Sequence, residues 1–208
     1  MSNKTILFFA ARHGETELNA DNCFRGHSNV SLDRQGRREA ASLAFYFQAI
    51  DLSHIVSSDK ARAIETAKTI GAAKAMPVVE TPNLHPWNVG EFSGQPKDAE
   101  NKERLQYYID HPDEPIPGGE ALNDFKTRVR PCYKEAAEMA ACCGEPVLLV
   151  MHSSNIHEIG SMIYDNHQST LVEPGGVVAV YAEGDQLGAE PIFRARKQSG
   201  QKRADTIS

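Results

Sequence analysis

Apolar runs alternate along the chain with stretches of helical periodicity. Runs with the length and composition of strands occupy residues 5 to 11, 53 to 57, 77 to 80, 146 to 151 and 176 to 182, with a weaker one at 187 to 194. Helical patterns between strands are typical of crossover connections in a parallel sheet. The pattern therefore predicts an α/β fold, a three-layer α/β/α sandwich with a mostly parallel central sheet and helices on both faces.

Two helices are predicted in the first third of the chain. The first spans about residues 36 to 49, opens after Gly36 and places four apolar residues on one face: Ala40, Leu43, Ala44 and Phe47. The second spans about residues 59 to 74. Asp59 stands at its start, where an acidic side chain suits the positive end of a helix.

The middle of the chain is interrupted by prolines. Residues 82 to 118 contain Pro82, Pro86, Pro96, Pro112, Pro115 and Pro117, with room for one short helix near 98 to 110. We interpret this segment as a cap inserted over the site within a single domain of residues 1 to 193. A long helix is expected from Glu120 to Cys143, kinked or divided at Pro131. Residues 194 to 208 form a basic tail that we expect to be disordered.

Composition and charge restrict the function. The chain has 208 residues and is 40% hydrophobic, which suffices for a full core, and its formal net charge of −6 argues against nucleic acid as a partner. No apolar run reaches the length of a membrane span or a secretory segment, so we expect a cytoplasmic protein with no membrane partner. The four cysteines lack metal-ligand spacing, and free thiols are expected. The sequence leaves the oligomeric state open.

The run Arg12-His13-Gly14-Glu15-Thr16 directly follows the first apolar run. Ligands of α/β sheets bind at strand ends, so this run places a histidine and an arginine where a ligand is expected. Neutral imidazole is a nucleophile toward phosphorus, and a guanidinium can bind two phosphoryl oxygens at once. Gly14 would let the backbone approach an anion without a Cβ in the way. The run predicts a phosphoryl-accepting histidine at His13 beside an arginine clamp at Arg12.

Further elements follow in order along the chain. They are Asn19, Phe24-Arg25-Gly26, Ser31-Leu32-Asp33-Arg34-Gln35-Gly36, the run from Ser57 to Ala67, and Val147-Leu148-Leu149-Val150-Met151-His152-Ser153-Ser154. This ordered set resembles the histidine phosphatase superfamily, in its phosphoglycerate mutase-like branch, over about residues 5 to 182. The RHGET and SSDxxRAxxTA elements are the specific part of the resemblance.

The resemblance implies roles for several residues. Arg62 would be a second oxyanion clamp, and His152 would hydrogen-bond the transferring phosphoryl group. Asn19, Arg25 and Ser153 would bind substrate, although this family often has Gly-Gly where Ser153-Ser154 stand. We interpret His157 as pointing elsewhere on its helix, either as an ordinary surface residue or as one that supports the site without contacting the substrate.

The chemistry itself asks for little more than these groups. Phosphoryl transfer depends chiefly on positioning and electrostatic stabilisation, so two guanidiniums and the imidazoles suffice without metal or another cofactor. The same cations keep His13 neutral.

The chain departs from the family at the proton donor. Most members carry Glu two residues after a Leu, and Leu84-His85-Pro86-Trp87 places Pro86 at that position. Proline cannot donate a proton, and a positioned general acid contributes roughly 10² to 10⁴ in rate. His85, Glu91 and Glu120 are candidate substitutes, with an ordinary surface role open for each.

We therefore predict a phosphatase that hydrolyses a small phosphorylated metabolite through a phosphohistidine and favours activated leaving groups. Two alternatives stay open: a phospho-ligand binding or regulatory protein with little turnover, and a phosphoglycerate mutase-like phosphotransferase. The loops of the cap would set the substrate, and their shape does not follow from the pattern.

Overall fold

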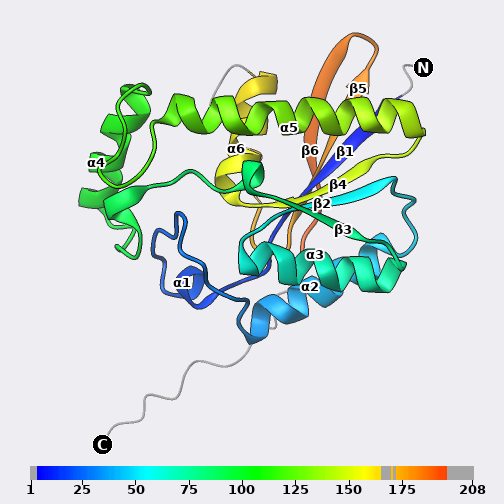
Figure 1. Ribbon diagram of the computed structural model, residues 1–208, viewed down its shortest axis with the longest axis horizontal. Helices are drawn as coiled ribbons and strands as arrows, with labels where there is room; N and C mark the ends of the chain where they lie inside the picture. The colour runs from blue at the N-terminus through cyan, green and yellow to red at the C-terminus, as the bar shows by residue number, and fades with distance from the viewer. Residues whose placement is uncertain (1–3, 165–169, 171, 196–208) are drawn as a thin grey trace, which may run out of the picture.

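The computed structural model describes residues 4–164, 170 and 172–195. Its centre is a six-stranded sheet in the order β3-β2-β4-β1-β5-β6 (Figure 1). The strands are β1 (Lys4–Arg12), β2 (His54–Ser58), β3 (Val78–Thr81), β4 (Val147–Met151), β5 (Val177–Glu183) and β6 (Gln186–Phe193). β1 to β4 are parallel, and β5 runs antiparallel to both of its neighbours. All six predicted strands are confirmed, with ends within one residue of those predicted.

Helices cover both faces of the sheet (Figure 1). α2 (Arg34–Phe47) and α3 (Ala61–Lys74) lie on one face, and α5 (Leu122–Cys143) and α6 (Ser153–Tyr164) lie on the other. β1 contributes alternately to both cores. Phe8 belongs to the buried cluster that contains Phe125 of α5, whereas Phe9 belongs to the cluster that contains Leu43 of α2. The three-layer α/β/α sandwich is thus confirmed.

Two predicted helix starts are wrong. α2 begins at Arg34, two residues before Gly36, because the Asp33 carboxylate accepts a hydrogen bond from the Gly36 amide at 2.7 Å and caps the helix. α3 begins at Ala61 with Lys60 in the capping position. Asp59 therefore caps nothing there, and its carboxylate contacts the His85 ring instead.

Pro131 does not divide the long helix. α5 continues through it from Leu122 to Cys143 (Figure 1). A proline inside a helix removes the hydrogen bond to the carbonyl four residues earlier, here that of Thr127. Both Thr127 and Pro131 are exposed, so water can satisfy that carbonyl.

Short elements make up the segment that we predicted to be a cap. Two 3₁₀ turns, η1 (Pro82–Leu84) and η2 (Gly90–Phe92), precede α4 (Ala99–Asp110), which is the short helix predicted near 98 to 110. The loop after α1 (Glu17–Ala20) runs beside the segment before α4, because Phe24 exchanges backbone hydrogen bonds with Gly94 and Gln95 at 2.8 and 2.9 Å. The cap and the first loop therefore form one rim.

Two further sequence predictions concern the basic tail and the absence of membrane spans. From residue 196 onward, the basic tail lies outside the described residues. Within the described ranges, none of the helices combines the length and apolarity that a membrane crossing requires.

Candidate active site

The pairing of β1 with β4 brings the two histidines together. Arg12 and Met151 are register partners at the ends of these parallel strands, so His13 and His152 leave the sheet side by side. The His13 amide donates to the Met151 carbonyl at 3.0 Å, and the two imidazole rings lie 5.1 Å apart at 60°. Both side chains are buried. The predicted site therefore forms at the carboxyl end of the central strands.

The hydrogen bonds of His13 define its tautomer. Nδ1 lies 2.7 Å from the Gly14 carbonyl, which can only accept, so Nδ1 carries the proton. Nε2 then holds a lone pair and accepts a hydrogen bond from Nε of Arg62 at 3.2 Å. Burial, followed by the charges of Arg62, Arg25 and Arg12, holds the pKa of His13 well below its usual value. His13 is a neutral imidazole with its nucleophilic nitrogen facing a guanidinium.

Arg62 is fixed by backbone carbonyls. Its Nη1 donates to Ser28 at 2.6 Å and its Nη2 donates to Gly26 at 3.2 Å. Burial, and then the charge of Arg12, lowers the pKa of Arg62 to about 10. Among the described residues no ion pair neutralises Arg62, so its charge is available to an anion beside His13.

The loop that carries His13 is locked onto α2 and α3. The Gly14 amide donates to Oγ1 of Thr66 at 3.2 Å, and the same hydroxyl donates to the Arg62 carbonyl at 2.8 Å. A Cβ on Gly14 would collide with the Gly36 backbone, and one on Gly36 would collide with Glu15. The contact between the loop and α2 thus requires Gly14, and the approach of an anion that the sequence suggested stays a prediction.

His152 faces His13 from the start of α6. Its Nε2 lies 2.9 Å from Oγ of Ser58 at the end of β2. Its Nδ1 is buried without a hydrogen-bond partner among the described residues. Burial, and then the charges of Arg62 and His13, lowers the pKa of His152 well below its usual value. If this nitrogen carries a proton, it could donate a hydrogen bond to a phosphoryl oxygen.

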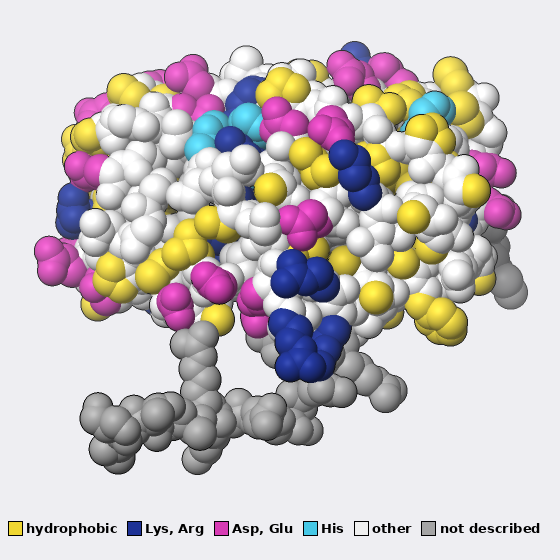
Figure 2. Space-filling model, turned by 60° about the horizontal axis from the view of Figure 1, so that its bottom comes forward, with side chains coloured by type: hydrophobic (Ala, Val, Ile, Leu, Met, Phe, Trp, Pro, Cys, Tyr) yellow, Lys and Arg dark blue, Asp and Glu magenta, His cyan; other side chains and the backbone are white. Residues whose placement is uncertain are grey.

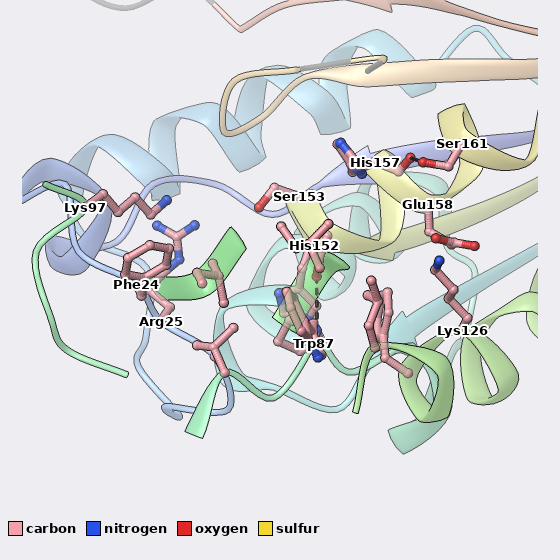
Figure 3. Close-up of a pocket in the computed structure, with 18 of the residues that line it drawn as sticks. Phe24, Arg25, Trp87, Lys97, Lys126, His152, Ser153, His157, Glu158 and Ser161 are labelled. Carbon is pink, nitrogen blue, oxygen red and sulfur yellow. Dashed lines mark hydrogen bonds between the residues drawn. The ribbon is translucent and has the colours of Figure 1, made fainter. Parts of the chain in front are cut away.

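A cavity of about 370 Å³ opens over the two histidines (Figure 3). Its lining includes His13 and four other polar residues that the sequence predicted for the site: Arg25, Arg62, His152 and Ser153. His157 also lines the cavity, so the expectation that it points elsewhere is wrong. Figure 2 shows acidic side chains spread over one face of the molecule around a few basic ones. In contrast, Arg25 and Arg62 are buried, so their charges act inside the cavity.

Arg12 and Asn19 stand beside this cavity and not in its lining. Both line a second cavity of about 160 Å³, whose wall shares Arg25 and Lys97 with the first. Nη1 of Arg12 donates to the Val172 carbonyl at 2.7 Å, while its buried Nε lacks a hydrogen-bond partner among the described residues. Oδ1 of Asn19 caps α1 by accepting from the Thr16 amide at 3.2 Å and hydroxyl at 3.0 Å.

Sequence reasoning missed several residues of the cavity lining, among them Lys97 and Glu158. Lys97 lies against both cavities, and burial, then the charges of Arg25 and Arg12, lowers its pKa to about 8. The predicted residue Arg25 is affected in the same way, because burial, and then the charges of Arg12 and Arg62, lowers its pKa to about 9. Glu158 is buried in α6 and pairs with Arg130 at 2.6 Å. Nothing in the local sequence marks either Lys97 or Glu158.

Pro86 lines the cavity at the position of the missing acid. Its carbonyl accepts hydrogen bonds from the His27 ring at 3.0 Å and from Arg128 at 3.4 Å, which hold the segment in place.

The three candidate acids are engaged elsewhere. The His85 ring contacts the Asp59 carboxylate, and Glu91 pairs with Arg104 at 2.6 Å on the surface. Glu120 accepts from the Asn88 amide at 2.8 Å and from Arg128 at 2.7 Å. None of the three belongs to the lining of the cavity among the described residues. The structure therefore does not bring the proposed substitutes to His13.

Comparison with known proteins identifies the family. A profile described as the histidine phosphatase superfamily (branch 1) matches residues 8–175. The chain belongs to this superfamily. The match contains every residue that lines the larger cavity. Within the described part of this histidine phosphatase, no group of three or more His, Cys, Asp or Glu side chains is placed to hold a metal ion.

Related proteins include mutases and phosphatases. The chain is 32% identical over 151 residues to "Probable phosphoglycerate mutase GpmB" of Yersinia enterocolitica, covering 71% of this chain and 69% of that protein. The mycobacterial glucosyl-3-phosphoglycerate phosphatase has a similar structure, with a TM-score of 0.76, 22% identity and coverage of 90% and 98%. A phosphoglycerate mutase from Bacillus anthracis gives a TM-score of 0.75, 23% identity and coverage of 92% and 93%.

Proposed function

We propose that this histidine phosphatase hydrolyses a small phosphorylated metabolite, without metal, through a phosphohistidine at His13. The observation that carries the proposal is the state of the His13 ring. Its Nδ1 proton is held by the Gly14 carbonyl, its Nε2 lone pair accepts a hydrogen bond from Arg62, and the residue lines the cavity. A buried neutral imidazole beside a fixed cation is suited to attack an anionic phosphoryl group.

The reaction has two steps. In the first, the Nε2 lone pair forms a bond to phosphorus while the ester P–O bond breaks, and the leaving oxygen takes that electron pair. In the second, water attacks the same phosphorus, and the N–P bond breaks with its electron pair returning to Nε2. One water hydrogen leaves on hydrogen phosphate, and the other passes to solvent and balances the proton that the leaving oxygen takes from solvent. Arg62 and His152 face the group that carries the developing charge, which is where preorganised donors contribute most.

Pro86 favours a particular class of leaving group. It occupies the cavity wall, and the three candidate acids lie outside the lining. A phenolate can leave without a proton, whereas an alkoxide needs one in the transition state. We infer a preference for activated esters.

A mutase is the second candidate, because the Yersinia relative carries that name. Returning a phosphoryl group to a hydroxyl needs proton transfer at the acceptor oxygen, and Pro86 supplies none. A phospho-ligand binding protein with little turnover is the third candidate. The cytoplasmic location and the small-molecule partner stay predictions.

The test is a reaction of EDTA-treated protein with nitrophenyl phosphate. We expect release of nitrophenol and of inorganic phosphate, and a brief reaction should label His13 with a phosphoryl group that is lost in acid and survives base. His13→Ala should be inert and unlabelled. A label on serine or cysteine, or a requirement for a divalent metal, would contradict the mechanism. A stable phosphoprotein without turnover would favour the binding role, and interconversion of phosphoglycerates would favour the mutase.

A further inference from the structure

The larger cavity has an apolar wall that the chemistry at His13 does not require. Phe24 comes from the loop after α1, and Trp87 follows η1 (Figure 3). Leu105 and Ile109 are four residues apart on α4 and so lie on one face of that helix. Phe125 adds the contribution of α5. Four separate segments thus place hydrophobic side chains around one cavity that His13 and His152 also line.

This wall is an open surface and not only the edge of a core. Phe24, Leu105 and Ile109 remain partly exposed while they pack against the buried cluster that contains Trp87 and Phe125. Apolar area that faces a water-filled cavity gains roughly 25 cal/mol for each Å² that a ligand covers. The volume of about 370 Å³ lies within the range of small-molecule sites, roughly 300 to 1,000 Å³.

The wall is also held in place before any ligand binds. The Trp87 amide donates to Oγ of Ser154 at 3.1 Å, and its indole N–H donates to the Glu120 carbonyl at 3.1 Å. Phe24 packs edge-to-face on Phe92 with ring centroids 6.0 Å apart. A preformed surface loses little conformational entropy on binding, so it favours a rigid apolar group.

The cavity is polar at its two ends. Arg25 and Arg62 lie at the end near His13, where the phosphoryl group would bind. At the other end, Lys126 and Glu158 point toward one another (Figure 3), and Glu158 is already paired with Arg130 at 2.6 Å. A ligand that fits is therefore short, with an anion at one end and an apolar body along the wall.

We propose that the substrate is an aryl phosphate: a phosphomonoester of a phenol-type hydroxyl, whose hydrophobic ring lies between Trp87 and the Leu105–Ile109 face of α4. The inference rests on the proposed function for the phosphoryl end and extends it to the leaving group. Pro86 and the wall agree on this class for independent reasons. The missing acid requires an oxygen that leaves unprotonated, and the wall requires an apolar group attached to that oxygen.

The first experiment separates hydrophobic recognition from leaving-group acidity. Phenyl phosphate and 4-tert-butylphenyl phosphate leave as phenols of similar acidity, the substituted one being slightly less acidic. Acidity alone therefore predicts equal rates, or a slower reaction for the bulkier ester. We expect kcat/KM to be at least about tenfold higher for the tert-butyl ester, because one added methylene in an apolar pocket already gives roughly 10- to 200-fold. Equal or lower kcat/KM would overturn the proposal.

The second experiment measures binding without turnover. Phenylphosphonate and methylphosphonate carry the same anionic group and cannot be hydrolysed as esters. Calorimetry should give at least about tenfold tighter binding for phenylphosphonate, and Trp87, the only tryptophan, should report it by a fluorescence change. Preferential phenylphosphonate binding without hydrolysis of any ester would refute the proposed function and keep the apolar subsite. Hydrolysis of esters with equal binding of the two phosphonates would keep the proposed function and refute the apolar subsite.

Variants on α4 locate the subsite. Leu105→Asn and Ile109→Asn should each reduce the tert-butyl preference and the phenylphosphonate preference by about fivefold or more, on the scale of a lost apolar contact. Tyr107→Asn is the matched control, because Tyr107 lies on the same helix, is 47% exposed and is not in the cavity lining. Its preferences should match those of the unaltered protein. If the control lowers the preferences as much as the two lining variants do, the assignment of the ring to this wall is wrong.

Discussion

Nε of Arg62 donates a hydrogen bond to Nε2 of His13 at 3.2 Å. The guanidinium therefore occupies the direction in which the nucleophile must attack. It is held there by the Ser28 and Gly26 carbonyls. An incoming phosphoryl oxygen would take over the Nε–H donor of Arg62 and so free the lone pair of His13 to attack, and the guanidinium would then stabilise the charge on the reacting group.

Arg62→Ala should lose about 2 to 4 kcal/mol of transition-state stabilisation, the scale for deleting one preorganised donor. This loss is measured as a decrease in kcat/KM for nitrophenyl phosphate. Arg62→Lys should recover little, since an ammonium cannot reproduce the two-pronged geometry of the guanidinium. Arg104→Ala is the control, because Arg104 pairs with Glu91 at the surface. Full activity in Arg62→Lys would mean that charge alone matters at this position.

The sequence predicts the position of the histidines well because sheet register determines it. Apolar runs located β1 and β4, and their parallel pairing places His13 and His152 side by side. Residues such as Lys97 are different. Lys97 reaches the cavity because the loop before α4 pairs with the loop after α1. These two loops lie about 70 residues apart in the sequence, and hydrophobic periodicity does not reveal a contact between them.

The starts of α2 and α3 also depend on side-chain contacts that the sequence pattern does not reveal. The start of α2 follows from the hydrogen bond between Asp33 and the Gly36 amide, and a glycine in the first turn concealed it. Asp59 resembled a helix cap in the sequence, but the His85 ring lies close enough to bind it. In both cases a competing polar contact decided the structure, and such contacts are visible only once the fold is known.

Lys97 should give the enzyme an alkaline limit. Burial and the charges of Arg25 and Arg12 lower its pKa to about 8, so raising the pH through 8 removes a positive charge from the wall shared by the two cavities. Inhibition by inorganic phosphate should weaken between pH 7 and 9. Lys97→Met should bind phosphate more weakly at pH 7 and lose most of that pH dependence below pH 8, while Arg25, with a pKa of about 9, keeps a part of it at higher pH. A variant whose phosphate inhibition weakens with pH as before would assign the limit to another group.

The buried histidines should make the folded state sensitive to acid. The pKa values of His13 and His152 are lowered on folding, so below about pH 6.5, the unperturbed value, the unfolded chain binds protons that the native state does not. Stability is therefore fully present above that pH and declines as the pH falls, by up to about 1.4 kcal/mol per pH unit for each group. Urea unfolding at pH 7 and pH 5 should show a smaller loss for His152→Asn than for the unaltered protein. The same substitution at the exposed His111 serves as the control.

Gly36→Ala tests the contact that holds the catalytic loop. Helix propensity alone predicts a gain of about 1 kcal/mol, but the added Cβ would collide with the Glu15 backbone. We expect a net loss of about 1 to 3 kcal/mol in the free energy of unfolding, on the scale of overpacking, together with reduced kcat as the His13 loop shifts. Ala41→Gly, on the exposed side of α2, should cost about 1 kcal/mol and leave kcat unchanged. A stabilised, fully active Gly36→Ala protein would show that the loop adapts freely.

Pro86→Glu tests whether the missing acid limits the chemistry. Pro86 lines the cavity, and its carbonyl is fixed by His27 at 3.0 Å and Arg128 at 3.4 Å, so a new carboxyl at this position starts from a constrained backbone. An alkoxide leaving group needs a proton in the transition state and a phenolate does not, so the variant should raise kcat/KM for glycerol phosphate more than for nitrophenyl phosphate. In the unaltered protein, kcat/KM should rise steeply as the leaving group becomes more acidic.

Pro86→Gln is the control, since it matches the shape of Glu and has no proton of that acidity to give. A flat dependence on leaving-group acidity in the unaltered protein, with one essential protonated group in the pH profile, would instead mean that a working acid exists; alanine substitution of His85, Glu91 and Glu120 would then show whether one of them moves to the cavity during turnover.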